Sequence, residues 1–382
     1  MLGDSSEIRY LSSITDIYSD SELTYFGDGS DFFVSVKHSL LSAKHFIFME
    51  FFTLRSGFML NDIIRILEKK AREGVKIYVL CDNIGSFHRI SLADMRRFRR
   101  AGIHIRFSMP IRSKWIRYIN NRDHTKIIIV DGHVAYTGGY NIADIYNNID
   151  QIYGYWKDAG VKVTGPAVRG FVDIFLKMWN FQSPTTLSVS YSEDIERPKI
   201  SEAPLCIPFL CKPRPLESER VARTAYLNMI RSAREILYLA TPYLVCDDEL
   251  IDALTDAMQR GVDVHIILPG HPDHILTFFV GRDTAIRLIR AGAHIYSFLP
   301  GMIHMKCITR DHESAIIGSI NYDYRSMDID FEIGCFSDDR KFIKQVENDL
   351  ISTITESEIL TEKDCKTHRF LTILGKIFKK QM

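Results

Sequence analysis

The sequence of 382 residues predicts an α/β protein in which two similar sandwich-like halves form one active site at their interface. Three observations support this prediction. Strand-like and helix-like patterns alternate along the chain, the same order of elements occurs twice at a nearly constant offset, and one short polar motif occurs once in each half. Alternating strands and helices indicate a mostly parallel or mixed sheet in each half.

The first half contains three apolar segments typical of strands, separated by amphipathic segments typical of helices. The strands are expected over 46–52, 75–80 and 103–107, and the helices end at Ala43, run over 60–72 and begin after the capping residue Ser91. Gly74 and Gly102 close the second and third helices, because glycine is favoured just after a helix end.

The second half repeats this order. Strands are expected over 235–240, 262–268 and 293–298, with one helix beginning near Asp247 and the next ending at Ala291. Matched landmarks lie 190, 187 and 190 residues apart, which indicates a tandem duplication. The predicted organisation is an N-terminal segment (1–19), a first half (20–183), a proline-bearing linker (184–214), a second half (215–360) and a basic amphipathic tail (361–382).

Composition narrows the class of protein. Lys plus Arg and Asp plus Glu number 48 each, and this balance argues against a nucleic-acid partner. The seven cysteines show no C-x2-C spacing and lie mostly in apolar runs, so we expect buried free thiols. Neither a metal site nor a cofactor is indicated. There is no signal-peptide pattern and no apolar run of 18 residues.

The duplicated motif is the strongest functional signal. It reads His124-x-Lys126-x4-Asp131 in the first half and His304-x-Lys306-x4-Asp311 in the second. Gly138-Gly139-Tyr-Asn141 follows the first copy, and Gly318-Ser319-Ile-Asn321 follows the second. From each histidine, the aspartate, the first glycine and the asparagine lie at the same offsets in both copies, which is very improbable by chance.

The residue types suit chemistry at a phosphate. If each motif is a strand, the histidine and the lysine at i and i+2 point to the same side. The histidine can attack phosphorus or donate a proton, while lysine and asparagine stabilise the nonbridging oxygens. Gly139 and Ser319 would let the backbone approach the anion. The expected substrate-binding residues are therefore Asn141, Asn321, Gly139 and Ser319.

Four carboxylates complete the expected site. Asp158 and Glu332 follow the asparagine of their own copy and are expected to fix the tautomer of a catalytic histidine. Asp131 and Asp311 belong to the motif and are included among the catalytic candidates. Each lies where a strand enters a turn, so a structural role or pairing with lysine is at least as well supported as direct chemistry.

These motifs, their spacing and the duplication resemble the phospholipase D superfamily, and within it the bacterial cardiolipin synthases over about residues 20–360. Further similar stretches are Trp156-Lys-Asp158, Thr241-Pro-Tyr243 and Asn321-Tyr-Asp323-Tyr-Arg325-Ser326. The resemblance implies a phospholipase D-type fold and a metal-independent transfer of a phosphatidyl group between two phosphatidylglycerol molecules. It also implies that His124 is the nucleophile and His304 the general acid. Members of the family commonly carry two N-terminal membrane-spanning helices, and this sequence is not expected to contain them; it is either a truncated form or a form that attaches in another way.

Two segments could contact a membrane. The tail carries Phe370, Leu374 and Ile377 at helical spacing, with Lys376 and Lys380 among its cations, and Trp115 lies in a basic aromatic patch before His124. A docked tail helix with a solvated basic face is an equal alternative. We expect the protein to lie at the cytoplasmic side of the cell membrane, with anionic phospholipid (phosphatidylglycerol) and the membrane surface as partners. A homodimer remains open.

Three other functions are compatible with the motifs. In a phospholipase D hydrolase, water would intercept the phosphohistidine and phosphatidic acid would form; the sequence alone does not separate hydrolysis from transfer. A nuclease is disfavoured by the zero net charge. A lipid-binding scaffold without activity would not need two intact histidine motifs.

Overall fold

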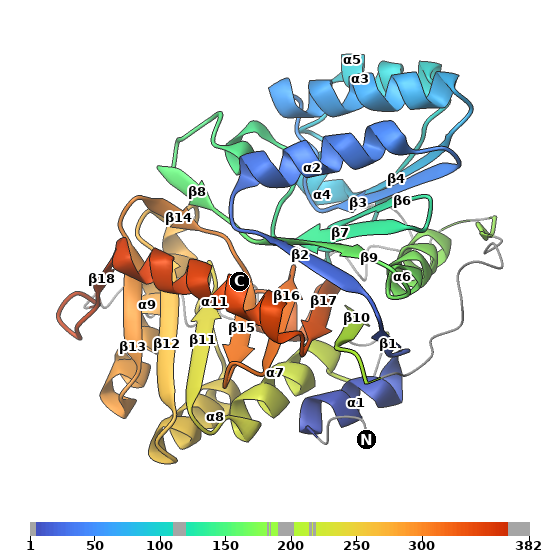
Figure 1. The fold of residues 1–382 in the computed structure, drawn as a ribbon. Coiled ribbons are helices and arrows are strands. Elements are labelled where there is room, and N and C mark those ends of the chain that lie inside the picture. Colours follow the sequence, from blue (N-terminus) through green and yellow to red (C-terminus); the bar gives the residue numbers. More distant parts are fainter. Residues whose placement is uncertain are drawn as a thin grey trace.

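The computed structural model describes residues 5–109, 120–181, 183, 185–189, 202–213, 216 and 219–365. Figure 1 shows two α/β halves, one formed mainly by the N-terminal part of the chain and the other mainly by the C-terminal part. Each half contains one large sheet, and the two sheets are stacked with helices between them and on their outer faces. The predicted duplicated α/β fold is confirmed.

The sheet of the first half has seven strands within the described residues, in the order β2-β9-β7-β6-β3-β4-β5. Their bounds are β2 (Glu22–Phe26), β3 (Phe46–Phe51), β4 (Lys76–Asp82), β5 (His104–Ser108), β6 (Ile127–Val130), β7 (Val134–Gly138) and β9 (Gly160–Thr164). The strands β3, β4 and β5 are parallel, and the other pairings are antiparallel. The sheet is therefore mixed, as the sequence predicts.

The second sheet has nine strands within the described residues, in the order β1-β10-β17-β16-β15-β11-β12-β13-β18. Their bounds are β1 (Tyr18–Ser19), β10 (Leu205–Cys211), β11 (Ile236–Ala240), β12 (Asp263–Pro269), β13 (His294–Phe298), β15 (Cys307–Arg310), β16 (Ser314–Gly318), β17 (Glu332–Ser337) and β18 (Ser357–Ile359). Its three parallel strands, β11, β12 and β13, repeat the arrangement of β3, β4 and β5.

Helices form the remaining layers (Figure 1). Their bounds are α1 (Ser6–Ile14), α2 (Gly29–Ser42), α3 (Phe58–Arg72), α4 (Asn83–Ser86), α5 (Leu92–Arg100), α6 (Val168–Phe181), α7 (Val221–Ser232), α8 (Asp248–Gln259), α9 (Ile275–Ala291), α10 (Tyr324–Asp328) and α11 (Arg340–Thr355). Apolar residues of α2 and α3 form the outer core of the first half, and those of α1, α7, α8 and α9 form the outer core of the second. The predicted cap Ser91 is confirmed, since its side chain accepts the Asp94 N–H in the first turn. The helix expected to begin near Asp247 does so, and Asp247 caps it by accepting the Leu250 N–H.

A third core joins the halves. Residues from α6, α11 and the inner faces of both sheets pack together there, for example Phe48 on Phe175 with ring centroids 4.5 Å apart. The helix α11 also bridges the halves through polar contacts, because Asp349 accepts hydrogen bonds from Tyr25 at 2.6 Å and from Lys157 at 2.6 Å. The two halves therefore share one continuous interior.

Some segments lie outside the domains that the sequence predicts. The strand β1, in the expected N-terminal segment, joins the second sheet by pairing with β10, and α1 packs against α7. The strand β10 lies inside the expected linker, where its residues are buried between β1 and β17. The linker was predicted partly from its prolines, among them Pro208. A proline lacks the N–H donor, but Pro208 still lies in the paired strand β10 opposite Cys335.

Two crossed backbone contacts connect the loops of one half with those of the other. The short strand β8 (Tyr155–Lys157) of the first half pairs with β14 (Gly301–Ile303) of the second. In the related place on the other side, Asp123 forms an isolated parallel bridge with Phe331. Each contact comes just before a histidine of the duplicated motif, and the fold thereby brings the two motifs to one interface.

Candidate active site

Each histidine of the motif is paired with a carboxylate from the opposite half. His124 Nδ1 lies 2.9 Å from Glu332 Oε1, and His304 Nδ1 lies 2.6 Å from Asp158 Oδ2. Backbone contacts hold both pairs, because the His124 N–H donates to Phe331 O at 2.9 Å and the His304 N–H donates to Lys157 O at 2.7 Å. The pairing leaves Nε2 of each ring available for chemistry at a substrate.

Both imidazole rings are largely withdrawn from water. Burial and the neighbouring ammonium groups of Lys126 and Lys306 lower the pKa of His124 and His304 well below the ordinary value. Aromatic rings enclose them: Phe52 meets His124 edge to face, and His304 lies against Tyr146 and Trp156. The rings are therefore neutral at pH 7, so one can act as a nucleophile without first losing a proton.

The two lysines of the motif are buried beside the histidines. Lys126 Nζ donates to the carbonyl oxygen of His124 at 2.6 Å, and Lys306 makes the equivalent bond to His304. Burial lowers the pKa of Lys126 to about 7 and that of Lys306 to about 8, although Glu332 and Asp158 favour the charged forms. An anionic phosphate placed here would restore both charges.

The two partner carboxylates are held differently. Glu332 accepts hydrogen bonds from the hydroxyls of Ser319 and of Ser326, the latter at 2.6 Å, and burial raises its pKa to about 8. Asp158 accepts the Ala159 N–H at 2.8 Å, and burial raises its pKa to about 7. Gly139 takes the place of Ser319 in the first half, because a Cβ there would come within 1.9 Å of Asp158 Oδ1.

Gly139 and Ser319 shape the surroundings of the two carboxylates, because Gly139 leaves room for Asp158 and the Ser319 hydroxyl donates to Glu332. Their expected contact with the substrate stays a prediction. The asparagines also differ from each other. Asn141 is buried, accepts the Thr53 N–H at 2.9 Å and donates to Tyr146 Oη at 2.9 Å, so it supports the ring next to His304. Asn321 lines a cavity, and its Oδ1 has no hydrogen-bond partner among the residues that the structure describes.

Of the two roles open for the motif aspartates, the structure supports the role in the turn. Asp131 has φ of 54° and its carboxylate accepts the N–H groups of Lys44, His45 and Phe46 at 2.7–2.8 Å. Asp311 has φ of 51° and binds the N–H groups of residues 234–236 in the same manner. Their inclusion among the catalytic candidates is thus corrected: they fasten the start of β3 and of β11.

A second correction concerns the local structure of the motif. The strands β6 and β15 begin at Ile127 and Cys307, after the lysines, so the His-x-Lys segments are the extended connections that lead into these strands. Thr125 and Met305, the residues between, are fully buried. The histidine and the lysine of each segment still point to the same side, although the segment is not part of a regular strand. Backbone hydrogen bonds to the opposite half hold each segment in this conformation.

A cavity of about 670 Å³ opens beside His124. Polar residues from both halves line it, among them Arg122 and Asn120 from the first half and Asn321, Asp323 and Arg325 from the second. Arg325 donates to Asp330 at 2.9 Å and to the side chain of Asn120 at 2.9 Å. Arg122 and Asn120 are site residues that the sequence pattern did not predict. Both lie just before the motif, where the offset between the halves falls from 190 to 180 residues.

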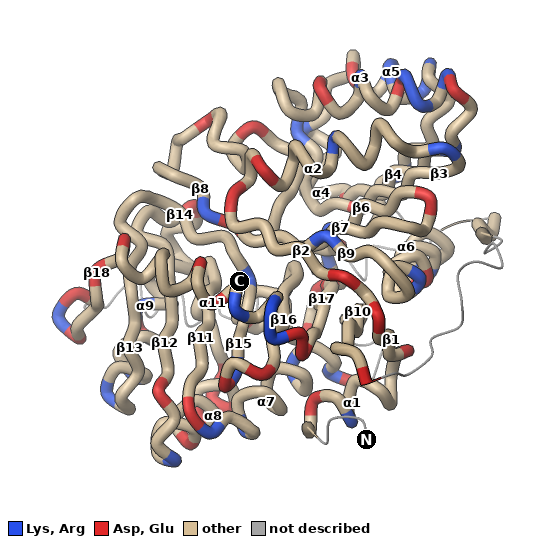
Figure 2. The backbone as a smooth tube through the Cα atoms, in the orientation of Figure 1, with Lys and Arg blue, Asp and Glu red and all other residues tan. Residues whose placement is uncertain are grey.

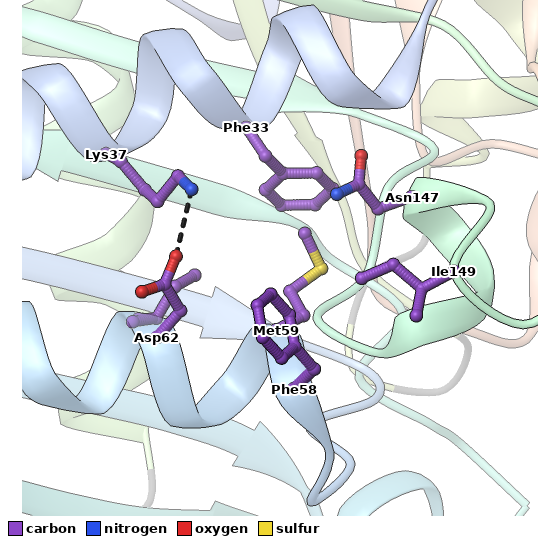
Figure 3. Close-up of a pocket in the computed structure, with 8 residues that line it drawn as sticks. Phe33, Lys37, Phe58, Met59, Asp62, Asn147 and Ile149 are labelled. Carbon is purple, nitrogen blue, oxygen red and sulfur yellow. Dashed lines mark hydrogen bonds and ion pairs between the residues drawn. The ribbon is translucent and has the colours of Figure 1, made fainter.

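A much smaller hollow lies in the first half. A hollow of about 30 Å³ between α2 and α3, lined by Phe33, Met59 and Ile149 and by the Lys37–Asp62 ion pair of 2.9 Å, is shown in Figure 3. It could hold about one water molecule. Acidic and basic residues occur on both halves (Figure 2).

Several sequence predictions concern metals, thiols and membrane contacts. All seven cysteines are free and buried, as expected. The described residues contain no group of three or more His, Cys, Asp or Glu side chains that could hold a metal ion. Among the helices of the described part of the chain, none combines the length and apolar character needed to cross a membrane. Trp115 and the tail residues Phe370, Leu374, Lys376, Ile377 and Lys380 lie outside the described residues.

A duplicated α/β fold with one histidine, one lysine and one crossed carboxylate from each half defines an enzyme of the phospholipase D type. The family model described as "Cardiolipin synthase, PLD-like domain" matches residues 36–152 and 226–354, which is more than half of the chain. The chain therefore belongs to this family, and it is an enzyme of the phosphatidyltransferase class that acts in phospholipid synthesis.

Individual relatives agree with this assignment. A cardiolipin synthase of Staphylococcus aureus is 30% identical over 344 residues, covering 90% of this chain and 69% of that protein. An uncharacterised protein of Streptococcus mutans is 34% identical over 369 residues, covering 95% of this chain and 78% of its own. The phosphatidylserine synthase of Haemophilus influenzae has a similar fold, with a TM-score of 0.77 at 14% identity, over 98% of this chain and all of that one.

The turn role of the motif aspartates predicts a loss of stability without a loss of catalytic chemistry. Replacing Asp131 by Ala removes three hydrogen bonds and puts alanine at a positive φ that aspartate adopts more readily. The free energy of unfolding should therefore fall by about 1–3 kcal/mol. Asp131→Asn keeps an acceptor and tolerates this φ, so it should cost less. Denaturant unfolding and kcat of the folded protein measure both effects; a collapse of kcat in stably folded Asp131→Asn would contradict the assignment.

Proposed function

We propose that the enzyme is a cardiolipin synthase that transfers a phosphatidyl group from one phosphatidylglycerol to another and releases glycerol. The observation that carries the proposal is the crossed arrangement of two neutral histidines, each with its Nδ1 on a buried carboxylate, around two buried lysines. This arrangement suits the two successive displacements at phosphorus that a transfer requires. Family membership and the cardiolipin synthase relatives support the choice of lipid.

In the first displacement, Nε2 of His124 attacks phosphorus of the donor and a P–N bond forms. The P–O bond to the glycerol headgroup breaks, and His304 gives a proton to the leaving oxygen. His304 is neutral in the free enzyme; the negative charge of the bound phosphodiester raises its pKa, so that His304 takes up a proton from water and Asp158 stabilises the imidazolium form that donates it. Glu332 holds the proton on Nδ1 of His124 so that Nε2 carries the lone pair. The resemblance to the superfamily supports giving the nucleophilic role to His124, which lines the open cavity.

In the second displacement, the headgroup hydroxyl of another phosphatidylglycerol enters. It loses its proton to His304, its oxygen attacks phosphorus, and the P–N bond to His124 breaks. The two histidines are thus restored to their starting forms. Lys126, Lys306 and Asn321 would stabilise the charge on the nonbridging oxygens during both steps.

The surroundings of the cavity fit a lipid substrate at a membrane surface. Ile84 of α4 and Ile275 of α9 line the cavity, and yet 45% and 67% of their surfaces are exposed. Apolar side chains at the mouth could enter the headgroup layer while the phosphodiester reaches His124. We therefore propose peripheral binding to the cytoplasmic face of the cell membrane, with the tail and the segment around Trp115 as further contacts.

Incubation with phosphatidylglycerol vesicles without added metal tests the reaction. Cardiolipin and free glycerol are the expected products, whereas phosphatidic acid would indicate a hydrolase. His124→Ala should abolish turnover, and His304→Ala should lower it by about 10²–10⁴-fold with a glycerol leaving group. A phosphorylated histidine trapped by acid quench should appear in the wild type and be lost in His124→Ala. A variant of either histidine that keeps most of its rate would overturn the two-histidine mechanism.

The buried lysines predict a fall of activity at alkaline pH. A lysine is charged below its pKa, and in the free enzyme this charge is lost as pH rises through about 7 for Lys126 and about 8 for Lys306. Because kcat/KM reports the free enzyme, it should fall above about pH 8. The profile of kcat should fall at higher pH, since a bound phosphodiester raises both pKa values. A value of kcat/KM that stays constant to about pH 10 would contradict this.

Membrane docking through the cavity mouth predicts a specific defect. Ile275→Ser should weaken binding to vesicles of phosphatidylglycerol by about tenfold, because an exposed apolar contact is lost from the lipid interface. Ile359→Ser is the matched control, since Ile359 is 53% exposed in β18 and does not line the cavity. Sedimentation with vesicles measures both. Equal binding of the two variants would remove the cavity mouth from the docking surface.

A further inference from the structure

A network of buried polar side chains lies beneath His124. Its members come from four segments of the first half that are far apart in sequence. They are Glu50 of β3, Asp82 of β4, Ser108 of β5, and Arg122 and Asp123 of the connection that leads to His124. The three carboxyl side chains are fully buried, and Ser108 and Arg122 are 3% and 6% exposed.

The network binds the backbone of the connection itself. Asp82 Oδ2 accepts the Asp123 N–H at 3.0 Å and Arg122 Nε at 3.0 Å. Asp123 Oδ1 accepts the Thr125 N–H at 3.3 Å, and its Oδ2 accepts the Ser108 hydroxyl at 2.7 Å. Glu50 is buried next to this network, and neither of its carboxyl oxygens has a hydrogen-bond partner among the described residues. Burial first, and then the Asp123 carboxylate, raise the pKa of Glu50 well above the ordinary value.

The connection is held from two sides in alternation. The N–H groups of Asp123 and Thr125 point to carboxylates of the first half. Those of Arg122 and His124 point to the second half, to Asp330 Oδ1 at 2.9 Å and to Phe331 O at 2.9 Å. Four successive N–H groups therefore have fixed partners, and His124 lies within this run.

The second half has the same backbone positions without the network. Glu50 pairs with Ile127 in the first sheet, and Ala240 pairs with Cys307 at the matching position of the second, so Ala240 replaces Glu50. Asp82 and Ser108 pair with each other in the first sheet. Pro269 and Phe298 pair with each other at the matching positions of the second sheet and replace them.

The residues just before the two histidines are also polar in the first half and apolar in the second. Arg122 and Asp123 correspond to Met302 and Ile303, which are fully buried. His304 is instead preceded by β14, which pairs residue by residue with β8, whereas the first half has only the bridge of Asp123 with Phe331. Every polar member of the network is thus replaced by an apolar residue beneath His304.

We propose that the hydrogen-bonded network of Asp82, Arg122, Asp123 and Ser108, with Glu50 buried beside it, is a positioning device that serves His124 and not His304. The inference rests on the proposed function only in taking His124 to act on a phosphodiester. Burying these groups costs free energy that an apolar core would not cost, and the second half shows that an apolar core can fill the same positions. The benefit is a fixed ring position where regular strand pairing is missing.

The test compares variants that copy one half into the other. Asp123→Ile introduces the residue of the second half. Asp123→Asn keeps one acceptor oxygen for the Thr125 N–H, and its amide NH2 can donate to the Ser108 hydroxyl oxygen. Ile303→Val is the control beneath His304. Rates are measured with phosphatidylglycerol and with a p-nitrophenyl phosphodiester, whose good leaving group needs no acid. His124→Ala and His304→Ala provide the two reference patterns, and thermal unfolding reports the folded fraction.

We expect Asp123→Ile to lower the rate with both donors by about 10²-fold and to show the donor dependence of His124→Ala. Asp123→Asn should recover most of the rate, and Ile303→Val should match the wild type. If Asp123→Ile does not fold, Ser108→Ala, which removes one hydroxyl, should show a smaller loss with the same donor dependence.

The proposal is overturned if folded Asp123→Ile keeps the wild-type rates, or if its donor dependence follows His304→Ala. It is also overturned if Asp123→Ile unfolds while Ser108→Ala and Asp123→Asn are fully active, because the network would then be structural only. Failure of the proposed function gives a different result, because the wild type would then make no cardiolipin. The rates of p-nitrophenol release would still show whether Asp123→Ile behaves like His124→Ala or like His304→Ala.

Discussion

The crossed hydrogen bonds between histidine and carboxylate are the interaction on which the site depends. His124 takes its partner Glu332 from the second half, and His304 takes Asp158 from the first. Because the two pairs exchange across the interface, neither half holds a complete site by itself. The shared core between the sheets and the bridging helix α11 fix the distance across which these bonds form. Packing far from the chemistry is therefore part of the catalytic geometry.

Burial sets the charge state of this arrangement. Two histidines, two lysines and two carboxylates lie out of water, and burial moves the pKa of each group toward its neutral form. A phosphodiester brings a negative charge that favours protonated lysine, so the binding of substrate and the charging of Lys126 and Lys306 support each other.

Much of the fold could be predicted from the sequence because hydrophobic periodicity and helix caps are local signals. The strands β3, β4, β5, β11, β12 and β13 lie within one or two residues of their predicted positions. The histidines, lysines and both partner carboxylates were found because the duplication repeats them. The crossing of the pairs was not predictable, since it depends on how two loops meet in space. Asn141 donates to Tyr146, whereas Asn321 lines the cavity, although both lie at the same offset from the histidine of their motif.

The differences between the halves show how a duplicated enzyme can give two equal motifs unequal tasks. The motif residues are the same in both halves, but the residues packed beneath them differ. The connection before His304 is held by strand pairing and apolar packing. The connection before His124 is held by hydrogen bonds to buried carboxylates. The open cavity is lined by His124 as well. His124 is positioned by side chains, so no strand has to run beside it and a large cavity can open there. His304 is positioned by the pairing of β14 with β8, and these strands enclose it. Enclosure suits proton transfer, and an open approach suits attack on a lipid phosphate.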